Sequence, residues 1–216
     1  MDTKKIYEKR FHDRSGREAM WKVLVEDFFQ KYIDEKDTVL DIGCGYGEFI
    51  NNIRCKKKLA VDLNPETKKY LNKEVDFYLT PSTRMSLIKN RSVDKVFISN
   101  FFEHIERKTI VGTVKEITRI LKPGGQVMIL QPNIRLLPND FWMFFDHITA
   151  VDDRALHELF ESSGFILEKR IVRFLPYTAE SNLPKNPIFI KLYLKLPFLW
   201  YFFGKQSFLI FKKLNN

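Results

Sequence analysis

The chain has 216 residues, of which 44% are hydrophobic and 29% are charged, and its formal net charge is +9 at pH 7. This composition is typical of one globular domain with a sizeable core, and it excludes general intrinsic disorder. The first 18 residues are strongly polar, and the two cysteines, Cys44 and Cys55, fit neither a disulfide framework nor a metal site. We therefore expect a cytoplasmic protein without a secretory signal or a metal, whose charge favours anionic partners.

The N-terminal segment, residues 1–35, is predicted to form a helical cap. Apolar residues recur at near-helical spacing between Trp21 and Ile33. Ahead of them, Tyr7 and Phe11 stand four residues apart on a polar stretch. This pair suits either a small staple onto the core or a lid over a bound cofactor.

Residues 39–49, with the sequence VLDIGCGYGEF, combine an apolar strand, an acid and three glycines at alternate positions. Closely spaced glycines lose much conformational freedom on folding, so they mark a backbone that turns sharply or touches a ligand. Asp62 closes the next short apolar run, nineteen residues after Gly43. Strand, glycine turn, helix, strand and acid is the layout of a nucleoside-binding βαβ unit, in which the second acid binds the ribose hydroxyls.

The glycine spacing distinguishes between two kinds of cofactor. A dinucleotide fingerprint is G-x-G-x-x-G, whereas this chain has D-x-G-x-G-x-G, with Asp41 at the strand end and Glu48 in place of the last glycine. A carboxylate here suits a ligand with a positive group better than a pyrophosphate. The pattern resembles motif I of the class I S-adenosylmethionine (SAM) methyltransferases. That resemblance implies SAM as the cofactor and S-adenosylhomocysteine as its product.

Strands and helices alternate further along the chain. The predicted elements are a helix over 66–71, strands over 75–79 and 95–100, a helix over 111–121 and a strand over 126–130. Such alternation predicts an α/β fold with a mostly parallel sheet, helices on both faces and ligands at the carboxyl ends of the strands. The sequences NFFEH (100–104) and LKPGG (121–125) also resemble class I methyltransferases at the matching places.

The resemblance implies a set of cofactor contacts. Many of these enzymes hold the adenine amino group with an acid after the third strand, but this chain has Thr80-Pro81-Ser82 there, so Ser82 or the backbone takes that role. The residues expected to contact SAM are Asp41, Gly43, Cys44, Gly45, Gly47, Asp62, Leu63, Ser82, Asn100 and Phe101.

The C-terminal third completes a Rossmann-like sheet of seven strands. A helix capped at Asp152 or Asp153 is predicted to end near Gly164, and a sixth strand follows over 165–174. The last strand, 206–213, is expected to be antiparallel. We therefore divide the single domain 1–216 into the cap, a core over 36–174, an insertion over 175–205 and this strand.

The insertion is long for a connection between neighbouring strands, which indicates a function or a structure of its own. Its segment 187–205 mixes apolar, aromatic and lysine residues, and Pro197 is expected to kink it. With fewer than 18 continuous apolar residues, it is a poor transmembrane span but suits a helix at a bilayer surface, peripheral to the inner face of the membrane. Packing on the sheet and a protein interface, such as a homodimer, are the alternatives.

Candidate catalytic residues follow the fourth and fifth strands. A hydroxyl acceptor needs a base, and His147 is our first candidate, with Asp146 as its partner and His104 as the rival base. Asn133 and Arg135, which follow the fifth strand, are expected to bind oxygens of the acceptor.

The whole chain resembles a bacterial and archaeal group of methyltransferases found among polysaccharide-assembly enzymes. The similar segments include QPNIR at 131–135, FFDH at 144–147 and RFLPYT at 173–178. The resemblance implies O-methylation of a glycan or a lipid-linked sugar. Methylation of RNA, methylation of a prenyl lipid or quinone, and a non-catalytic partner subunit are the alternatives. RNA is disfavoured because the basic residues are interleaved with large aliphatic ones.

Overall fold

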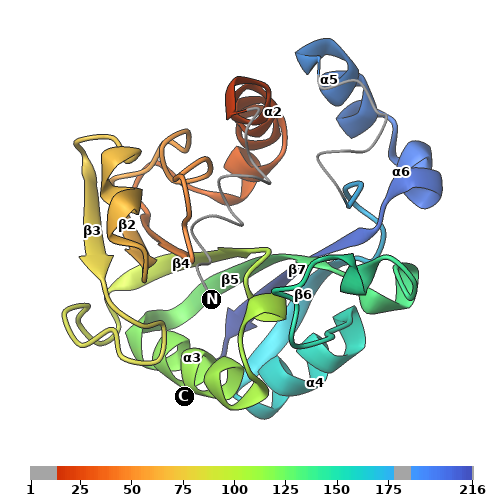
Figure 1. Cartoon of the computed structure of the whole chain (residues 1–216). Helices are drawn as coiled ribbons and strands as arrows, with labels where there is room; N and C mark the ends of the chain where they lie inside the picture. The colour runs from red at the N-terminus through yellow and green to blue at the C-terminus, as the bar shows by residue number, and fades with distance from the viewer. Residues whose placement is uncertain (1–13, 178–185, 216) are drawn as a thin grey trace.

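A single seven-stranded sheet with the order β3-β2-β1-β4-β5-β7-β6 forms the centre of the computed structural model, which describes residues 14–177 and 186–215 (Figure 1). The strands are β1 (Thr38–Ile42), β2 (Lys57–Asp62), β3 (Val75–Leu79), β4 (Val93–Ser99), β5 (Leu121–Pro132), β6 (Phe165–Ile171) and β7 (Gln206–Lys213). Neighbouring strands pair in parallel except at β7, which is antiparallel to both β5 and β6. The predicted fold, with its antiparallel last strand, is confirmed.

Helices cover both faces of this sheet. The α-helices are α2 (Arg14–Asp27), α3 (Arg107–Ile120), α4 (Asp153–Ser162), α5 (Pro187–Lys195) and α6 (Pro197–Phe203). Short 3₁₀ helices are η1 (Phe29–Tyr32), η2 (Pro65–Lys69), η3 (Phe102–His104), η4 (Ile134–Leu136) and η5 (Phe141–Met143). Figure 1 shows α3 and α4 on one face, and α2, α5 and α6 on the other.

The buried side chains form two apolar clusters, one on each side of the sheet. Successive strand residues point to opposite faces, so Leu40 of β1 packs with α3 and α4, whereas Val39 packs with α2. Because both faces are covered, the inner parts of the central strands, such as 96–98 of β4 and 127–130 of β5, are continuously apolar and lack the alternation of a half-exposed strand.

Three predicted elements differ from the observed ones. Helices are predicted after the glycine turn and over 66–71, but the first segment forms turns and the second forms the five-residue η2. Each segment spans only the short gap between neighbouring strands. Asn64 caps η2 through a side-chain bond from the Glu66 amide. The sixth strand ends at Ile171 and not at residue 174, since the chain there leaves the sheet and buries Phe174 under α6. Tyr7 and Phe11 lie outside the described residues.

The insertion between β6 and β7 contains α5 and α6, and Pro197 separates them as predicted. Its inner side belongs to the core: Leu194 is buried, and the Trp200 indole donates to the Tyr193 carbonyl oxygen at 2.8 Å. The ring of Phe28 stacks on the ring of Phe174, with 4.2 Å between their centroids, and it contacts the Trp200 ring edge-on, with 6.0 Å between centroids. None of the helices in the described ranges is long and apolar enough to cross a membrane.

This aromatic contact generates a prediction for stability. Phe28→Ala removes a buried ring shared by the N-terminal helix, β7 and the insertion, and it should lower the free energy of unfolding by about 3–5 kcal/mol. The matched control is Phe202→Ala on the exposed side of α6, which should change it by less than about 0.5 kcal/mol. Urea denaturation of both variants measures the difference, and equal losses would contradict the assigned core.

Candidate functional site

The site predicted from the glycine motif lies at the switch point of the sheet. β1 pairs with β2 on one side and with β4 on the other, so the chain reverses its direction of growth between β1 and β4. Ligands of open α/β sheets bind at this point, outside the carboxyl ends of the strands. The glycine turn follows β1 here, Asp62 ends β2, and Asn100 and Phe101 follow β4.

The glycine turn is held open by backbone conformations that favour glycine. Gly43, Gly45 and Gly47 have φ of 69°, 53° and 75°. A Cβ on Gly43 would lie 2.5 Å from the Phe101 ring, whereas a Cβ on Gly45 would meet nothing within 4 Å. The backbone of Gly45 therefore faces open space, as it must where a ligand approaches closely.

Asp62 ties the glycine turn to the end of β2. Its Oδ2 accepts the Gly45 amide at 2.9 Å, and its Oδ1 accepts the Asn64 amide at 2.9 Å. Burial raises the pKa of this carboxyl, and hydrogen bonds from the backbone amides of Asn64, Gly45 and Leu63 partly offset that effect. The carboxylate thus has a fixed orientation beside the open face of Gly45, which suits the predicted contact with ribose hydroxyls.

Two further acids surround the turn. Asp41 is buried, and its pKa is raised well above the ordinary value by desolvation and by the charges of Glu48 and Asp62. Glu48 forms an ion pair with Arg17 of α2. A buried cluster of carboxylates costs folding free energy unless a positive group compensates it. The sulfonium and the amino group of SAM are positive, so the cluster fits that cofactor.

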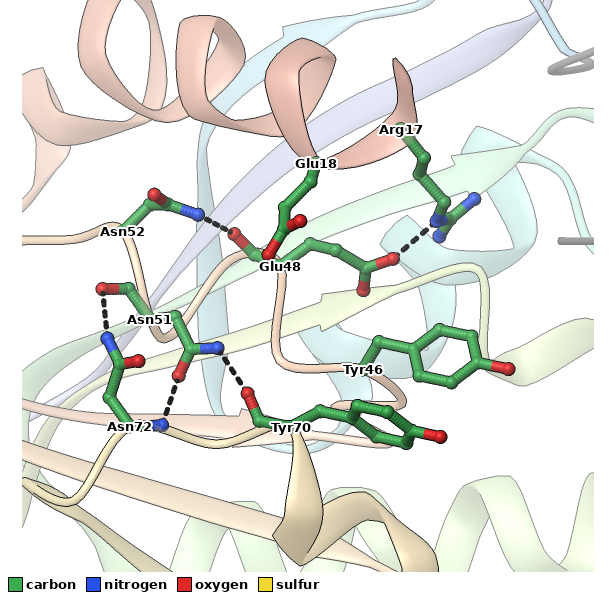
Figure 2. Close-up of a pocket in the computed structure, with 8 residues that line it drawn as sticks. All are labelled: Arg17, Glu18, Tyr46, Glu48, Asn51, Asn52, Tyr70 and Asn72. Carbon is green, nitrogen blue, oxygen red and sulfur yellow. Dashed lines mark hydrogen bonds and ion pairs between the residues drawn. The ribbon is translucent and has the colours of Figure 1, made fainter. Parts of the chain in front are cut away.

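A polar pocket separates the start of α2 from the glycine turn (Figure 2). It is lined by Arg17, Glu18, Tyr46, Glu48, Asn51, Asn52, Tyr70 and Asn72. Asn51 donates to the Tyr70 carbonyl at 2.9 Å and accepts the Asn72 amide at 2.9 Å, while Asn52 donates to the Glu48 carbonyl at 2.7 Å. These amides brace the turn from behind, and Figure 2 shows the Tyr46 and Tyr70 rings lying side by side.

Two of the expected cofactor contacts have other roles. The hydroxyl of Ser82 is buried and bonds Thr113 of α3 at 2.7 Å, so its side chain does not reach an adenine. Cys44 packs in the core below the turn, and burial raises the pKa of its thiol well above the usual range. Leu63, in contrast, is exposed directly after Asp62, and its predicted contact with the cofactor stays a prediction.

The turn after β4 is strained. Asn100 has a φ of 48°, and its amide donates to the Leu130 carbonyl of β5 at 2.9 Å. Asparagine tolerates this conformation better than most residues do, and such strain is common at functional sites. The bend brings the ring of Phe101 against Gly43, so the turn after β4 borders the glycine turn.

Beyond Phe101, four polar side chains gather at the carboxyl ends of β4 and β5. The Asp146 carboxylate lies 3.3 Å from Nδ1 of His104, and Nε2 of the same ring lies 3.8 Å from the buried carboxylate of Glu103. The rings of His104 and His147 are 4.9 Å apart. The three predicted catalytic residues therefore meet, and the contact found for the Asp146 carboxylate is with His104, where the sequence analysis placed it beside His147.

Glu103 was not among the predicted site residues. Its Oε2 accepts from Gln131 of β5 at 2.8 Å, and desolvation raises its pKa while the neighbouring His104 lowers it. Tyr177 was also missed, and its hydroxyl lies 3.4 Å from Nδ1 of His147. The adjacency of Glu103 to His104 was the available signal. Tyr177 lies in the segment RFLPYT, but nothing local links it to His147, which is 30 residues away.

Asn133 and Arg135, which are predicted to bind the acceptor, have partners within the protein. Asn133 is buried, its amide donates to Asp153 at 2.7 Å and to Ser207 at 2.8 Å, and its oxygen accepts the Arg135 amide. The guanidinium of Arg135 lies 3.2 Å from the Asp153 carboxylate. Both residues therefore fasten the start of α4 to the loop after β5, because the buried charge of Asp153 needs partners.

The open face of Gly45 provides a test of the cofactor site. Gly45→Val places two methyl groups in the space next to the Asp62 carboxylate and adds strain at a positive φ, so SAM binding should be lost. Gly164→Val is the control, since Gly164 also has a positive φ and open surroundings but lies after α4. Isothermal titration with SAM measures both, and unchanged affinity in the first variant would refute the assignment.

Asp41 should oppose folding while it supports binding. Its raised pKa means that the folded state holds more protons than the unfolded state between the two pKa values, so stability falls as pH rises through that window. Asp41→Asn keeps an acceptor for the Ile50 amide and should raise the melting temperature above that window, by about 2–4 °C per kcal/mol relieved. SAM affinity should fall. Thermal melts at several pH values test this, and a lower melting temperature would contradict it.

Solved structures share this fold across nearly the whole chain. A SAM-dependent methyltransferase from Archaeoglobus fulgidus has a TM-score of 0.68 and 20% identity, covering 98% of this chain and 100% of that chain. A complex between the Haloferax volcanii Trm112 methyltransferase activator and a methyltransferase has a TM-score of 0.71 and 16% identity, and the match covers 98% of this chain and 97% of that chain. A third structure is geranyl diphosphate C-methyltransferase from Streptomyces coelicolor, solved with Mg²⁺, geranyl diphosphate and S-adenosylhomocysteine. It has a TM-score of 0.62 and 13% identity, and the match covers 89% of this chain and 77% of that chain.

Two uncharacterized proteins of Methanocaldococcus jannaschii are similar in sequence. One is 27% identical over 137 residues, which are 62% of this chain and 53% of that protein. The other is 29% identical over 155 residues, 68% of this chain and 64% of that protein. The chain thus spans between about half and two thirds of the length of these relatives.

A protein family described as Methyltransferase domain matches residues 13–169, which include the glycine turn, Asp62 and the turn after β4. The seven-stranded order, the open face of Gly45 and the surrounding acids agree with this match. The chain therefore belongs to the methyltransferase domain family, and it has the class I fold with S-adenosylmethionine as its cofactor.

Proposed function

We propose that the protein methylates a hydroxyl oxygen of a lipid-linked glycan at the surface of a membrane. The observation that carries this proposal is an exposed aromatic surface next to the histidine cluster. On α5 and α6 it comprises Ile188, Phe189, Leu192, Phe198, Tyr201, Phe202 and Phe203. In the loop before His147 it comprises Trp142, Met143 and Phe145. We call these two groups together the aromatic face.

Lys205 joins the two parts of this face. Its ammonium donates to the Leu136 carbonyl at 3.0 Å, and its own carbonyl accepts the Asn133 amide at 3.1 Å. The end of α6 is thereby fixed to the loop that leads to His147. A lipid-linked acceptor could lie with its lipid against the aromatic face and its sugar at the histidine cluster.

The charge of this region favours a lipid surface with anionic headgroups. Residues 181–216 contain six lysines and neither aspartate nor glutamate. Lys191 and Lys195 are exposed on α5 among the apolar residues. Aromatic and aliphatic side chains partition into the headgroup boundary while lysines interact with anionic lipids, which is the pattern of a peripheral amphipathic surface.

The reaction requires positioning and the uptake of one proton. SAM, when bound, supplies an electrophilic methyl carbon, whose bond to sulfur breaks as its bond to the acceptor oxygen forms. The cleft between Gly45 and Phe101 orients the cofactor, and alignment of the reacting atoms can remove roughly 7–11 kcal/mol of the barrier. The cluster of His104, Asp146 and His147 receives the hydroxyl proton.

The identity of the acceptor is tested by label transfer. Methyl-labelled SAM is incubated with the protein and a membrane extract, which is then split into organic, aqueous and macromolecular fractions. We expect label in the organic fraction, in a product that mild acid converts into a water-soluble methylated sugar. Label that stays in the organic phase would instead indicate a prenyl lipid or quinone. Label confined to RNA or soluble glycans would refute the lipid-linked acceptor.

The aromatic face is tested separately with vesicles of phosphatidylcholine and phosphatidylglycerol. Replacing Phe198 and Phe202 with serine should weaken binding by at least about tenfold, since each ring contributes roughly 1.5–3 kcal/mol when it leaves water. Leu87→Ser is the control, because Leu87 is 74% exposed but lies before β4. Cosedimentation measures binding. Equal binding by all three proteins would show that the face serves another purpose, such as a protein interface.

A further inference from the structure

Glu103, His104 and His147 bring three metal-binding side chains to one point. Each offers one ligand atom, and these atoms all lie within 4.8 Å of one another. The residues come from the turn after β4 and from the loop after β5, so the sheet and not the local sequence brings them together. The sequence offers no indication of a metal, because its two cysteines fit no metal site and the two histidines stand 43 residues apart.

Each of the three side chains also has a second polar partner on its outer side. The Glu103 carboxylate accepts from Gln131 at 2.8 Å, Nδ1 of His104 lies 3.3 Å from Asp146, and Nδ1 of His147 lies 3.4 Å from the Tyr177 hydroxyl. Metal-binding histidines usually have such partners on the other ring nitrogen, which fix the tautomer and the orientation of the ring. The arrangement therefore orients Nε2 of both rings and one oxygen of Glu103 inward.

The cluster brings two carboxylates together at a largely buried place. Glu103 is only 1% exposed, and the Asp146 carboxylate is close to the same imidazole. Among the described residues, the Glu103 carboxylate contacts the Gln131 amide, its own backbone amide and His104. The oxygen of the Gln131 amide, Oε1, is buried without a hydrogen-bond partner among the same residues. A cation with bound water would compensate the charge and could supply that missing donor.

We propose that Glu103, His104 and His147 bind a divalent transition-metal ion, with Zn²⁺ or Mn²⁺ as the natural occupant. Two imidazoles and one carboxylate suit such ions better than Mg²⁺ or Ca²⁺, which prefer oxygen ligands. Ligand atoms around a tetrahedral ion lie about 3.4 Å apart, given metal–ligand bonds of about 2.1 Å. The Nε2 atom of His104 is already 3.8 Å from Oε1 of Glu103, so small side-chain rotations complete the site.

Three protein ligands leave a position for the substrate. This role rests on the proposed function: the acceptor hydroxyl binds the ion, which lowers the pKa of that hydroxyl. With both histidines bound to the ion, the hydroxyl proton passes to solvent water, and the oxygen takes the methyl group as the bond from that carbon to the sulfur of SAM breaks. Asp146 is a positioning residue in this arrangement, because it holds His104 from the outer side of the ring. The site lies three residues beyond Phe101, beside the cofactor cleft.

The test is a titration of the tag-free full chain with Co²⁺ after treatment with a chelator. We expect one equivalent to bind, with visible absorption bands of a Co²⁺ ion that has nitrogen and oxygen ligands. His104→Gln and His147→Gln should each weaken binding by at least about tenfold. His157→Gln is the matched control, because His157 lies on α4 outside the cluster and should leave binding unchanged.

Several outcomes decide the proposal. Failure of the unaltered chain to bind Co²⁺, or equal binding by the cluster variants and the control, would overturn it. Melting curves confirm that each variant is folded. If the variant of the buried His147 does not fold, the variant of the partly exposed His104 decides the test. SAM titration of the metal-free chain should give unchanged affinity. Co²⁺ binding together with label outside the lipid fraction would refute the proposed acceptor and leave the metal site intact.

Discussion

The bond between the Gly45 amide and the Asp62 carboxylate is the constraint on which the site depends. It joins the loop after β1 to the end of β2 at 2.9 Å, directly at the switch point of the sheet. Because the amide is engaged by Asp62, the other side of Gly45 stays open. The same bond holds a negative charge in the cleft, where burial alone would favour its loss.

Charge burial is arranged differently on the two sides of β4. Around the glycine turn, Asp41, Glu48 and Asp62 crowd together and suit a positive cofactor. At the carboxyl ends of β4 and β5, Glu103 and Asp146 face two histidines. In both places a bound cation would offset the cost of burying the acids.

The insertion has one side that packs in the domain core and one side that is exposed. Leu194 and Trp200 pack against Phe28 and Phe174, so the inner side of α5 and α6 is part of the domain core. The opposite side exposes large aromatic residues such as Phe198 and Phe202 to solvent. Without the inner contacts the short helices would not form in water, because a helix of seven to nine residues is marginal on its own.

The sequence by itself determined the order of elements, the glycine turn and the cofactor class, because those depend on local spacing and on strand-to-strand alternation. It also indicated Asp41, Asp62 and Phe101, which stand at strand ends. Only the tertiary structure decided that Ser82, Asn133 and Arg135 face internal partners, and that Asp146 contacts His104. It alone united Glu103 with His147, because a sheet aligns the ends of strands that are far apart in the chain, and no local pattern records which side chains then meet.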